Sequence, residues 1–246
     1  MMHRIAGCLT AIITPMSRDL VVDCEGLGRL VDFQVEQSVS GIVAVGTTGE
    51  SPTLDWGEHN KVLALIHESI NGRCLTVGGT GSNSTREALK ATEYASEVGV
   101  KSILLVDPYY NGPSSIEIRR EYVEPIAKKF PEIQFVPYVI PGRTGTQLLP
   151  QDLAILHSEL PNVNAVKEAT GNLDNMKRAR YEKALGMTVL HVVDKLRNSE
   201  TPIPTNTSCA LSQKLCIETW LHDDNEPWKE IVIQTLKEIL SREGKR

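Results

Sequence analysis

The chain has 246 residues, of which 41% are hydrophobic and 23% are charged, and its formal net charge at pH 7 is −5. This composition is typical of a globular protein and excludes a disordered or fibrous chain. The acidic balance, with no basic stripe of interleaved aromatic residues, argues against nucleic acid as a partner. No apolar run reaches the roughly 18 residues that span a bilayer, and residues 1–13 lack the features of a secretory signal, so we expect a cytoplasmic protein with no membrane partner.

The cysteines point away from metal and disulfide chemistry. They are odd in number, scattered along the chain and never spaced as CxxC: Cys8, Cys24, Cys74, Cys209 and Cys216. We therefore expect reduced thiols, with no metal site and no disulfide framework.

Seven short runs rich in Val, Ile and Leu predict seven β-strands. The runs are continuously apolar rather than alternating, which is typical of strands buried on both faces of a parallel sheet. They cover residues 8–13, 42–45, 75–77, 103–106, 134–138, 163–166 and 188–193.

The segments between these runs carry the signals of helix starts. The predicted first residues are polar caps or proline: Asp23, Asp55, Ser84 with Glu87 as a capping box, Ser115, Pro150 and Asn172. Strand and helix therefore alternate about every 30 residues, the length of one βα unit. This rhythm predicts a right-handed parallel α/β array, and we favour a barrel over an open sheet.

The rhythm breaks after residue 193. An eighth strand is due near residues 215–222, where Leu211 and Leu215 with their polar neighbours predict a helix instead. Residues 225–242 predict a second amphipathic helix. We therefore expect seven βα units over residues 1–195 and a shortened helical region over residues 196–246, with no readable eighth strand.

In such folds the functional side chains follow the carboxyl ends of the strands. Lys167 interrupts an apolar strand at such an end, which places its amine in a low-dielectric interior. Desolvation disfavours a charged amine, and a neutral amine can attack a carbonyl carbon. The alternative is a structural lysine that pairs with Glu168 or another carboxylate.

Other strand ends offer hydroxyl groups and a guanidinium. Thr47 and Thr48 lie between glycines and can donate hydrogen bonds to a small carboxylate, although a plain turn explains them equally well. Tyr138 and Tyr110 are either proton relays or phenols with ordinary partners. Arg143, in a glycine-rich loop, suits a bidentate contact with a carboxylate, or is an ordinary surface arginine.

Four ordered motifs in this chain resemble the dihydrodipicolinate synthase / N-acetylneuraminate lyase family. They are Gly46-Thr47-Thr48-Gly49-Glu50-Ser51, Pro108-Tyr109-Tyr110-Asn111, Tyr138 with Pro141-Gly142-Arg143-Thr144-Gly145, and Lys167-Glu168-Ala169-Thr170-Gly171. The resemblance covers about residues 4–190. It implies a (β/α)8 TIM barrel and a class I Schiff-base aldolase, a lyase that needs no metal or organic cofactor.

The resemblance also implies roles for individual residues. Lys167 would form an imine with pyruvate, and Tyr138 resembles the tyrosine that transfers protons at this imine. Thr47 and Tyr110 resemble the hydroxyls that relay protons to solvent. In the family that last tyrosine comes from a neighbouring subunit, which implies a homodimer or homotetramer. Thr47 and Thr48, in the turn that begins at Gly46, would hold the pyruvate carboxylate.

The second substrate and an effector follow from the same resemblance. Arg143 resembles the arginine that binds the carboxylate of L-aspartate 4-semialdehyde, which favours synthesis of 4-hydroxy-tetrahydrodipicolinate, in lysine biosynthesis by the diaminopimelate pathway, over cleavage of sialic acid. A lysine effector site would comprise His59, Asn83, Glu87 and Tyr109. Ordinary helix-surface positions also explain His59 and Glu87.

The chain departs from the family after strand seven. The family's Ser-Gly-Asp-Asp ending is replaced by His191-Val192-Val193-Asp194, and a segment resembling its Asn-Pro-Ile-Pro motif follows on the order of fifty residues too soon. One reading is a working enzyme whose barrel is closed by residues 209–220 or by a partner. The others are a different pyruvate-dependent aldolase, an impaired paralogue, or a non-catalytic subunit that pairs with a longer relative.

Overall fold

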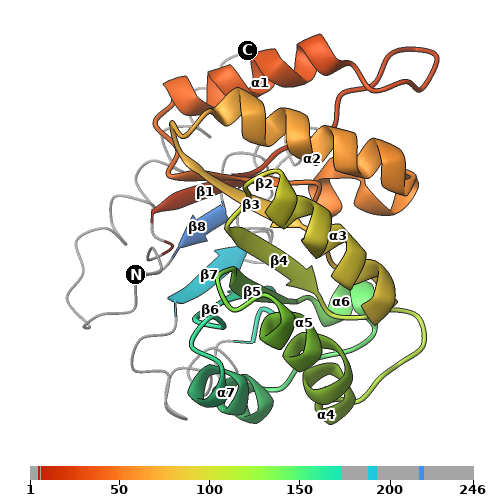
Figure 1. The fold of residues 1–246 in the computed structure, drawn as a ribbon, viewed down its shortest axis with the longest axis vertical. Helices are drawn as coiled ribbons and strands as arrows, with labels where there is room; N and C mark the ends of the chain where they lie inside the picture. The colour runs from red at the N-terminus through yellow and green to blue at the C-terminus, as the bar shows by residue number, and fades with distance from the viewer. Residues whose placement is uncertain (1–4, 6, 173–187, 193–215, 219–246) are drawn as a thin grey trace, which may run out of the picture.

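The structure is a computed structural model that describes residue 5, residues 7–172, and the backbone of residues 188–192 and 216–218. Eight strands form a closed barrel in chain order (Figure 1). They are β1 (Cys8–Ala11), β2 (Gly41–Ala44), β3 (Leu75–Gly79), β4 (Ser102–Val106), β5 (Gln134–Val139), β6 (Ala165–Glu168), β7 (Thr188–Val192) and β8 (Cys216–Glu218). The barrel and the seven strands expected from the apolar runs are thereby confirmed, with ends that differ by up to two residues.

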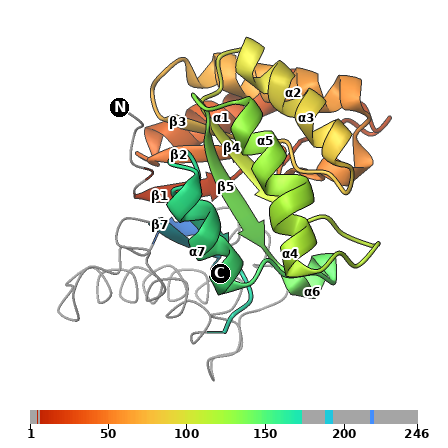
Figure 2. The same ribbon diagram turned by 60° about the horizontal axis from the view of Figure 1, so that its bottom comes forward.

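Helices cover the outer face of the strands (Figure 2). The α-helices are α1 (Cys24–Glu36), α2 (Trp56–Ile70), α3 (Thr85–Glu97), α4 (Ser115–Glu117), α5 (Glu124–Lys129), α6 (Pro141–Thr144) and α7 (Pro150–Glu159). Two 3-10 turns, η1 (Thr47–Gly49) and η2 (Ser51–Thr53), follow β2, and a π-helix, η3 (Ile118–Val123), joins α4 to α5. No helix in the described part of the chain has the length and apolar character that a membrane crossing requires.

Two apolar layers result from the alternation of side chains along each strand. An inner cluster fills the barrel and includes Val77, Leu104, Val136 and Tyr138. A larger outer cluster packs the strands against the helices, and Val139 belongs to it. Neighbouring residues of β5 therefore point to opposite sides of the barrel wall, and polar groups at the strand ends follow the same rule.

The helix starts are mostly as expected. The Asp23 carboxylate accepts a hydrogen bond from the Gly26 N–H, and the Asp55 carboxylate accepts one from the Glu58 N–H, both at 2.8 Å. The capping box expected at Ser84 is only half formed, because the Glu87 carboxylate accepts from the Ser82 hydroxyl instead of from the Ser84 backbone. A complete capping box forms at Ser114, one residue before the expected start. The helix expected after Asn172 lies outside the described residues.

The C-terminal expectation is wrong in one respect, because residues 216–218 form a strand and not part of a helix. This strand, β8, pairs antiparallel with both β7 and β1 (Figure 1). The edges of the first and seventh strands are therefore paired, by residues within the segment 209–220, which removes the cost of open hydrogen-bonding groups. An antiparallel strand needs no preceding crossover helix, so it falls outside the βα rhythm used to count strands. The rest of the predicted helical region lies outside the described residues.

Close packing between β2 and β3 makes Gly79 a sensitive position. A Cβ atom there would lie 2.5 Å from the carbonyl oxygen of Val45, whereas one at Gly28 in α1 meets nothing within 4 Å. We expect Gly79→Ala to lower the free energy of unfolding by about 1–3 kcal/mol. Gly28→Ala, the control, should leave it unchanged or raise it by up to about 1 kcal/mol. Urea unfolding of both variants measures the difference, and equal stabilities would contradict the packing argument.

Candidate active site

A lysine and a tyrosine come together inside the barrel at the carboxyl ends of neighbouring strands. Val106 of β4 is the register partner of Tyr138 of β5, which in turn is the partner of Lys167 of β6. The side chains of Tyr138 and Lys167 are buried, with 4% and 6% exposure. The Lys167 Nζ atom lies 4.2 Å from the centre of the Tyr138 ring. The strand register thus places an amine over a phenol in the buried interior of the barrel.

The alternative of a salt-bridged Lys167 is not supported. None of the ion pairs among the described residues includes Lys167. Glu168 is the next residue of β6 and therefore alternates to the other side of the barrel wall. An amine held beside a ring, without a carboxylate counter-ion in this part of the chain, is a group available for chemistry.

The turn after β2 is held in a strained and hydrogen-bonded form. Val45 and Glu50, on either side of it, have φ values of +45° and +59°, in the left-handed region that residues other than glycine rarely adopt. The Gly49 N–H donates to the Gly46 carbonyl, and the Thr14 hydroxyl donates to the Gly49 carbonyl at 2.8 Å. Such strain is typical of binding sites, and here it positions the half-buried hydroxyls of Thr47 and Thr48.

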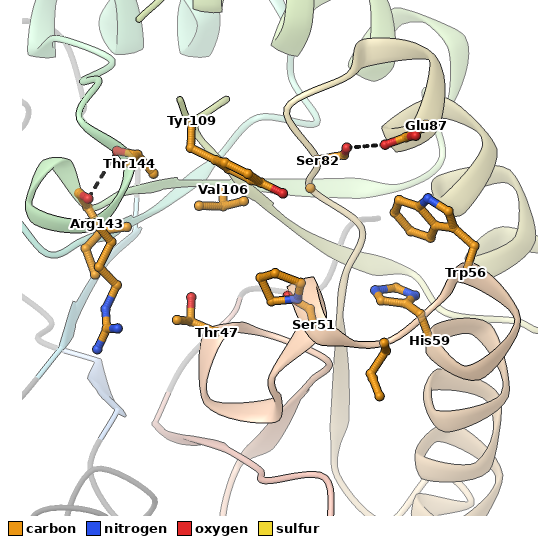
Figure 3. A pocket seen from close by; sticks show the side chains of 14 residues that line it. Thr47, Ser51, Trp56, His59, Ser82, Glu87, Val106, Tyr109, Arg143 and Thr144 are labelled. Carbon is orange, nitrogen blue, oxygen red and sulfur yellow. Dashed lines mark hydrogen bonds between the residues drawn. The ribbon is translucent and has the colours of Figure 1, made fainter. Parts of the chain in front are cut away.

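A cavity of about 330 Å³ opens beside this turn. Figure 3 shows Thr47 and Arg143 toward one end, Tyr109 across the middle, and His59, Trp56 and Glu87 toward the other end. The expected substrate residues Thr47 and Arg143 and three of the four expected effector residues thus share one cavity. The fourth, Asn83, lies with Tyr109 at a second hollow of about 340 Å³.

Tyr110 does not join the other candidates. Its side chain is 92% exposed, and its backbone has a φ value of +72°. It is not among the residues that line either cavity. Within one chain, the phenol of Tyr110 therefore faces solvent, while the phenol of Tyr138 is buried beside Lys167.

The end of the cavity that holds the expected effector residues contains a buried histidine. His59 is 3% exposed, and its ring meets that of Trp56 edge to face, with centroids 4.9 Å apart. Burial lowers the pKa of His59 below the ordinary value of 6.5, because desolvation disfavours the imidazolium. His59 therefore presents a neutral ring at neutral pH. The alternative that His59 is an ordinary helix-surface residue is wrong, because its side chain is buried.

Three residues of this region were missed by the sequence reasoning. Trp56 precedes His59 by one helical turn, a spacing that brings two rings together. Ser82 holds the carboxylate of Glu87 at 2.7 Å. Asp107 is buried directly after β4, and a charged residue at the end of an apolar strand was the available signal. No group of three or more metal-binding side chains occurs among the described residues.

The fold and this site define an α/β barrel with a buried lysine at the carboxyl end of the sixth strand. The model of the dihydrodipicolinate synthetase family matches residues 4–208, and the chain belongs to that family. The sequence resemblance is thereby confirmed.

Known proteins resemble this chain over much of its length. It is 44% identical over 170 residues to the 4-hydroxy-tetrahydrodipicolinate synthase of Methanococcus maripaludis, which covers 69% of this chain but only 58% of that relative. A dihydrodipicolinate synthase structure from Cyanidioschyzon merolae with lysine bound is 30% identical, with a TM-score of 0.76, over 85% of this chain and 72% of the other. A chloride-inhibited dihydrodipicolinate synthase from Acinetobacter baumannii, complexed with pyruvate, is 35% identical, with a TM-score of 0.74, over 85% and 76%.

The buried environment of His59 predicts its charge state. Between about pH 5 and pH 7 an ordinary histidine titrates, and His59 should take up its proton at a lower pH because burial lowers its pKa. The ring ¹⁵N chemical shifts of His59, measured by NMR across this range, report the charge directly. The same resonances in the urea-unfolded protein are the control, and parallel titration in both states would contradict the prediction.

Proposed function

We propose that the protein is a Schiff-base lyase that condenses pyruvate with L-aspartate 4-semialdehyde to 4-hydroxy-tetrahydrodipicolinate. The observation that carries this proposal is the Lys167 amine, buried 4.2 Å above the Tyr138 ring without an ion-pair partner among the described residues. The relatives named as synthases of this product support it, although the chain spans 58% of the length of such a relative. The protein would then act in lysine biosynthesis, in the cytoplasm.

The chemistry begins with the Lys167 amine, which attacks the keto carbon of pyruvate. Loss of water gives an imine, and this electron sink allows a proton to leave the pyruvate methyl group. The enamine that results attacks the aldehyde carbon of the second substrate, whose oxygen takes up a proton and becomes the 4-hydroxyl group. The amine of the second substrate then attacks the imine carbon, which closes the ring and releases the Lys167 amine. The Tyr138 phenol is positioned to move protons at the imine, a role that contributes about 10²- to 10⁴-fold in rate. All of these steps use side chains of the protein, so no separate cofactor is part of the proposal.

The two carboxylates need separate binding groups. The turn at Gly46, with the hydroxyls of Thr47 and Thr48, offers donors for pyruvate next to β2. Arg143 lines the cavity at the same end as Thr47 and suits the carboxylate of the aldehyde, since its guanidinium can donate two hydrogen bonds. The cavity of about 330 Å³ that Thr47 and Arg143 line has room for a small acid, while Tyr138 and Lys167 are not among its lining residues.

The exposed Tyr110 supports a homo-oligomer, as a homodimer or homotetramer. Its side chain is 92% exposed and lines neither cavity, yet the family motif assigns it to a proton relay with Thr47. Tyr110 of a second copy would supply the missing hydroxyl. In this arrangement neither site is complete in a monomer.

Borohydride trapping tests the proposed imine. Incubation with pyruvate and sodium borohydride should leave a reduced pyruvyl adduct on Lys167, which peptide mass spectrometry locates. Lys167→Arg should abolish the adduct, and the surface variant Lys128→Arg should keep it. Tyr138→Phe should lower turnover by about 10²- to 10⁴-fold, through loss of proton transfer.

Two outcomes would reject the proposal in different ways. A folded protein without an adduct would be a non-catalytic member of the family. An adduct without turnover of L-aspartate 4-semialdehyde would instead indicate another pyruvate-dependent aldolase.

A lysine effector site is a second proposal, carried by the shared cavity. His59, Glu87 and Tyr109 line the same cavity as Thr47, and the related structure from Cyanidioschyzon merolae contains lysine. The Glu87 carboxylate is suited to the ammonium groups of lysine, while the neutral His59 adds no repulsion. Asn83, expected at the same site, borders the adjoining hollow.

Calorimetric titration with L-lysine tests this effector site. We expect binding by the unmodified protein and an affinity about tenfold lower or more for Glu87→Gln, since a hydrogen bond to a charged group contributes about 1.5–3 kcal/mol. Glu93→Gln, at an exposed ion pair with Lys129, is the matched control. Equal affinity in both variants would contradict the assignment.

A further inference from the structure

The helical segment after β4 contains a π-helical turn. Residues Ile118–Val123 form η3, between α4 and α5, and the Glu124 N–H donates to the Arg119 carbonyl, five residues back instead of four. A π turn inserted between α-helical segments is rare and is frequently found at functional sites. The side-chain contacts of η3 include two with the loop between β3 and α3, which borders the cavity.

Pro125 accounts for this turn and for one of the two contacts. It has no backbone N–H, and in an α-helix its ring would clash with the carbonyl four residues earlier, which is that of Glu121. A π turn directly before the proline avoids this clash. The Glu121 carbonyl therefore lacks the N–H donor that an α-helix would supply, and the Thr85 hydroxyl donates to it at 2.8 Å. The proline thus leaves an acceptor that binds the start of α3.

A buried phenol from the same turn holds the loop at a second point. The Tyr122 hydroxyl accepts a hydrogen bond from the Ser82 N–H at 3.0 Å, and the two residues are 2% and 3% exposed. Gly81 permits this approach, because a Cβ atom there would lie 3.2 Å from the Tyr122 oxygen and 2.5 Å from the Val106 nitrogen. Because the bond is buried, a Ser82 N–H that lost the phenol oxygen would be left unpaired, at a cost in free energy.

Ser82 connects this bond to the carboxylate of Glu87. Its hydroxyl donates to Oε2 of Glu87 at 2.7 Å and accepts from the Ser84 N–H at 3.2 Å. Figure 3 shows the bond between Ser82 and Glu87 at the end of the cavity that also holds Trp56. Two hydrogen bonds, one on each side of Ser82, therefore join the Tyr122 phenol to the carboxylate that lines this end.

We propose that Tyr122 is a positioning residue that directs the Glu87 carboxylate toward an ammonium group of the effector lysine. The phenol fixes the backbone of Ser82, and the Ser82 hydroxyl in turn orients Glu87. This role rests on the proposed effector site and does not involve the imine chemistry at Lys167. Without the phenol oxygen, the loop loses its buried attachment, the carboxylate is free to turn away, and effector binding weakens.

Calorimetric titration of variants with L-lysine tests this role. Tyr122→Phe, which removes only the phenol hydroxyl, should lower the affinity about two- to tenfold, the effect of one hydrogen bond. Tyr94→Phe is the matched control, because it removes a half-buried phenol from α3, the helix that carries Glu87, and it should keep the affinity of the unmodified protein. Thr85→Val, which removes the bond to Glu121 without altering the buried core, is a second variant and should also weaken binding.

Two further readouts separate positioning from a general loss of stability. In a Glu87→Gln background, Tyr122→Phe should change the affinity for L-lysine by less than about twofold, because the carboxylate through which it acts is absent, whereas independent effects would add. Hydrogen exchange of residues 82–85 should accelerate relative to that of β4 in Tyr122→Phe but not in Tyr94→Phe, since the Ser82 N–H loses its acceptor only in the first variant.

Each failure has its own signature. An unchanged affinity in Tyr122→Phe, together with weaker binding by Glu87→Gln, would overturn the positioning role and keep the effector site. Additive effects in the double variant, or unchanged exchange of residues 82–85, would also overturn it. A lack of L-lysine binding by the unmodified protein would reject the effector site and this role with it. Absence of the Lys167 adduct would instead reject the proposed condensation, and the lysine and exchange measurements would still test Tyr122.

Discussion

The hydrogen-bond register between β4, β5 and β6 is the constraint on which the site depends. Parallel pairing aligns Val106, Tyr138 and Lys167 in one row, and the alternation of side chains turns this row toward the barrel interior. A slip of one residue would send Lys167 outward and bring Glu168 inside. The meeting of amine and phenol therefore follows from backbone hydrogen bonds, and their burial maintains it.

The same alternation separates two kinds of polar chemistry across one barrel wall. Inside, the amine of Lys167 lies over a ring with no carboxylate paired to it among the described residues. Outside, Glu168 places an acidic group next to the helices, where it does not neutralise the amine by direct contact. A thin wall of strands thus keeps the acid and the amine apart over a short distance, which an irregular loop could not do as reliably.

Closure of the sheet shows how a barrel tolerates a departure from the βα rhythm. The three residues of β8 pair antiparallel with β7 and β1, and hydrogen bonds then run around the whole ring. Pairing only requires two open edges and a short extended segment, whatever its direction. The chain therefore has both the family's sequence pattern and a closed barrel. It does so while spanning 58% of the length of a relative such as the synthase of Methanococcus maripaludis.

The sequence by itself determined the strands, most helix caps and the candidate residues, because apolar runs, capping side chains and motif spacing are local properties. It did not reveal β8, since three residues carry no periodicity and their partners lie far away in the chain. The half-formed cap at Ser84 was missed because Ser82 competes for Glu87 in three dimensions. The neutral state of His59 and the bond between Tyr122 and Ser82 were decided only by the tertiary structure, because burial and hydrogen bonding depend on residues that folding brings together.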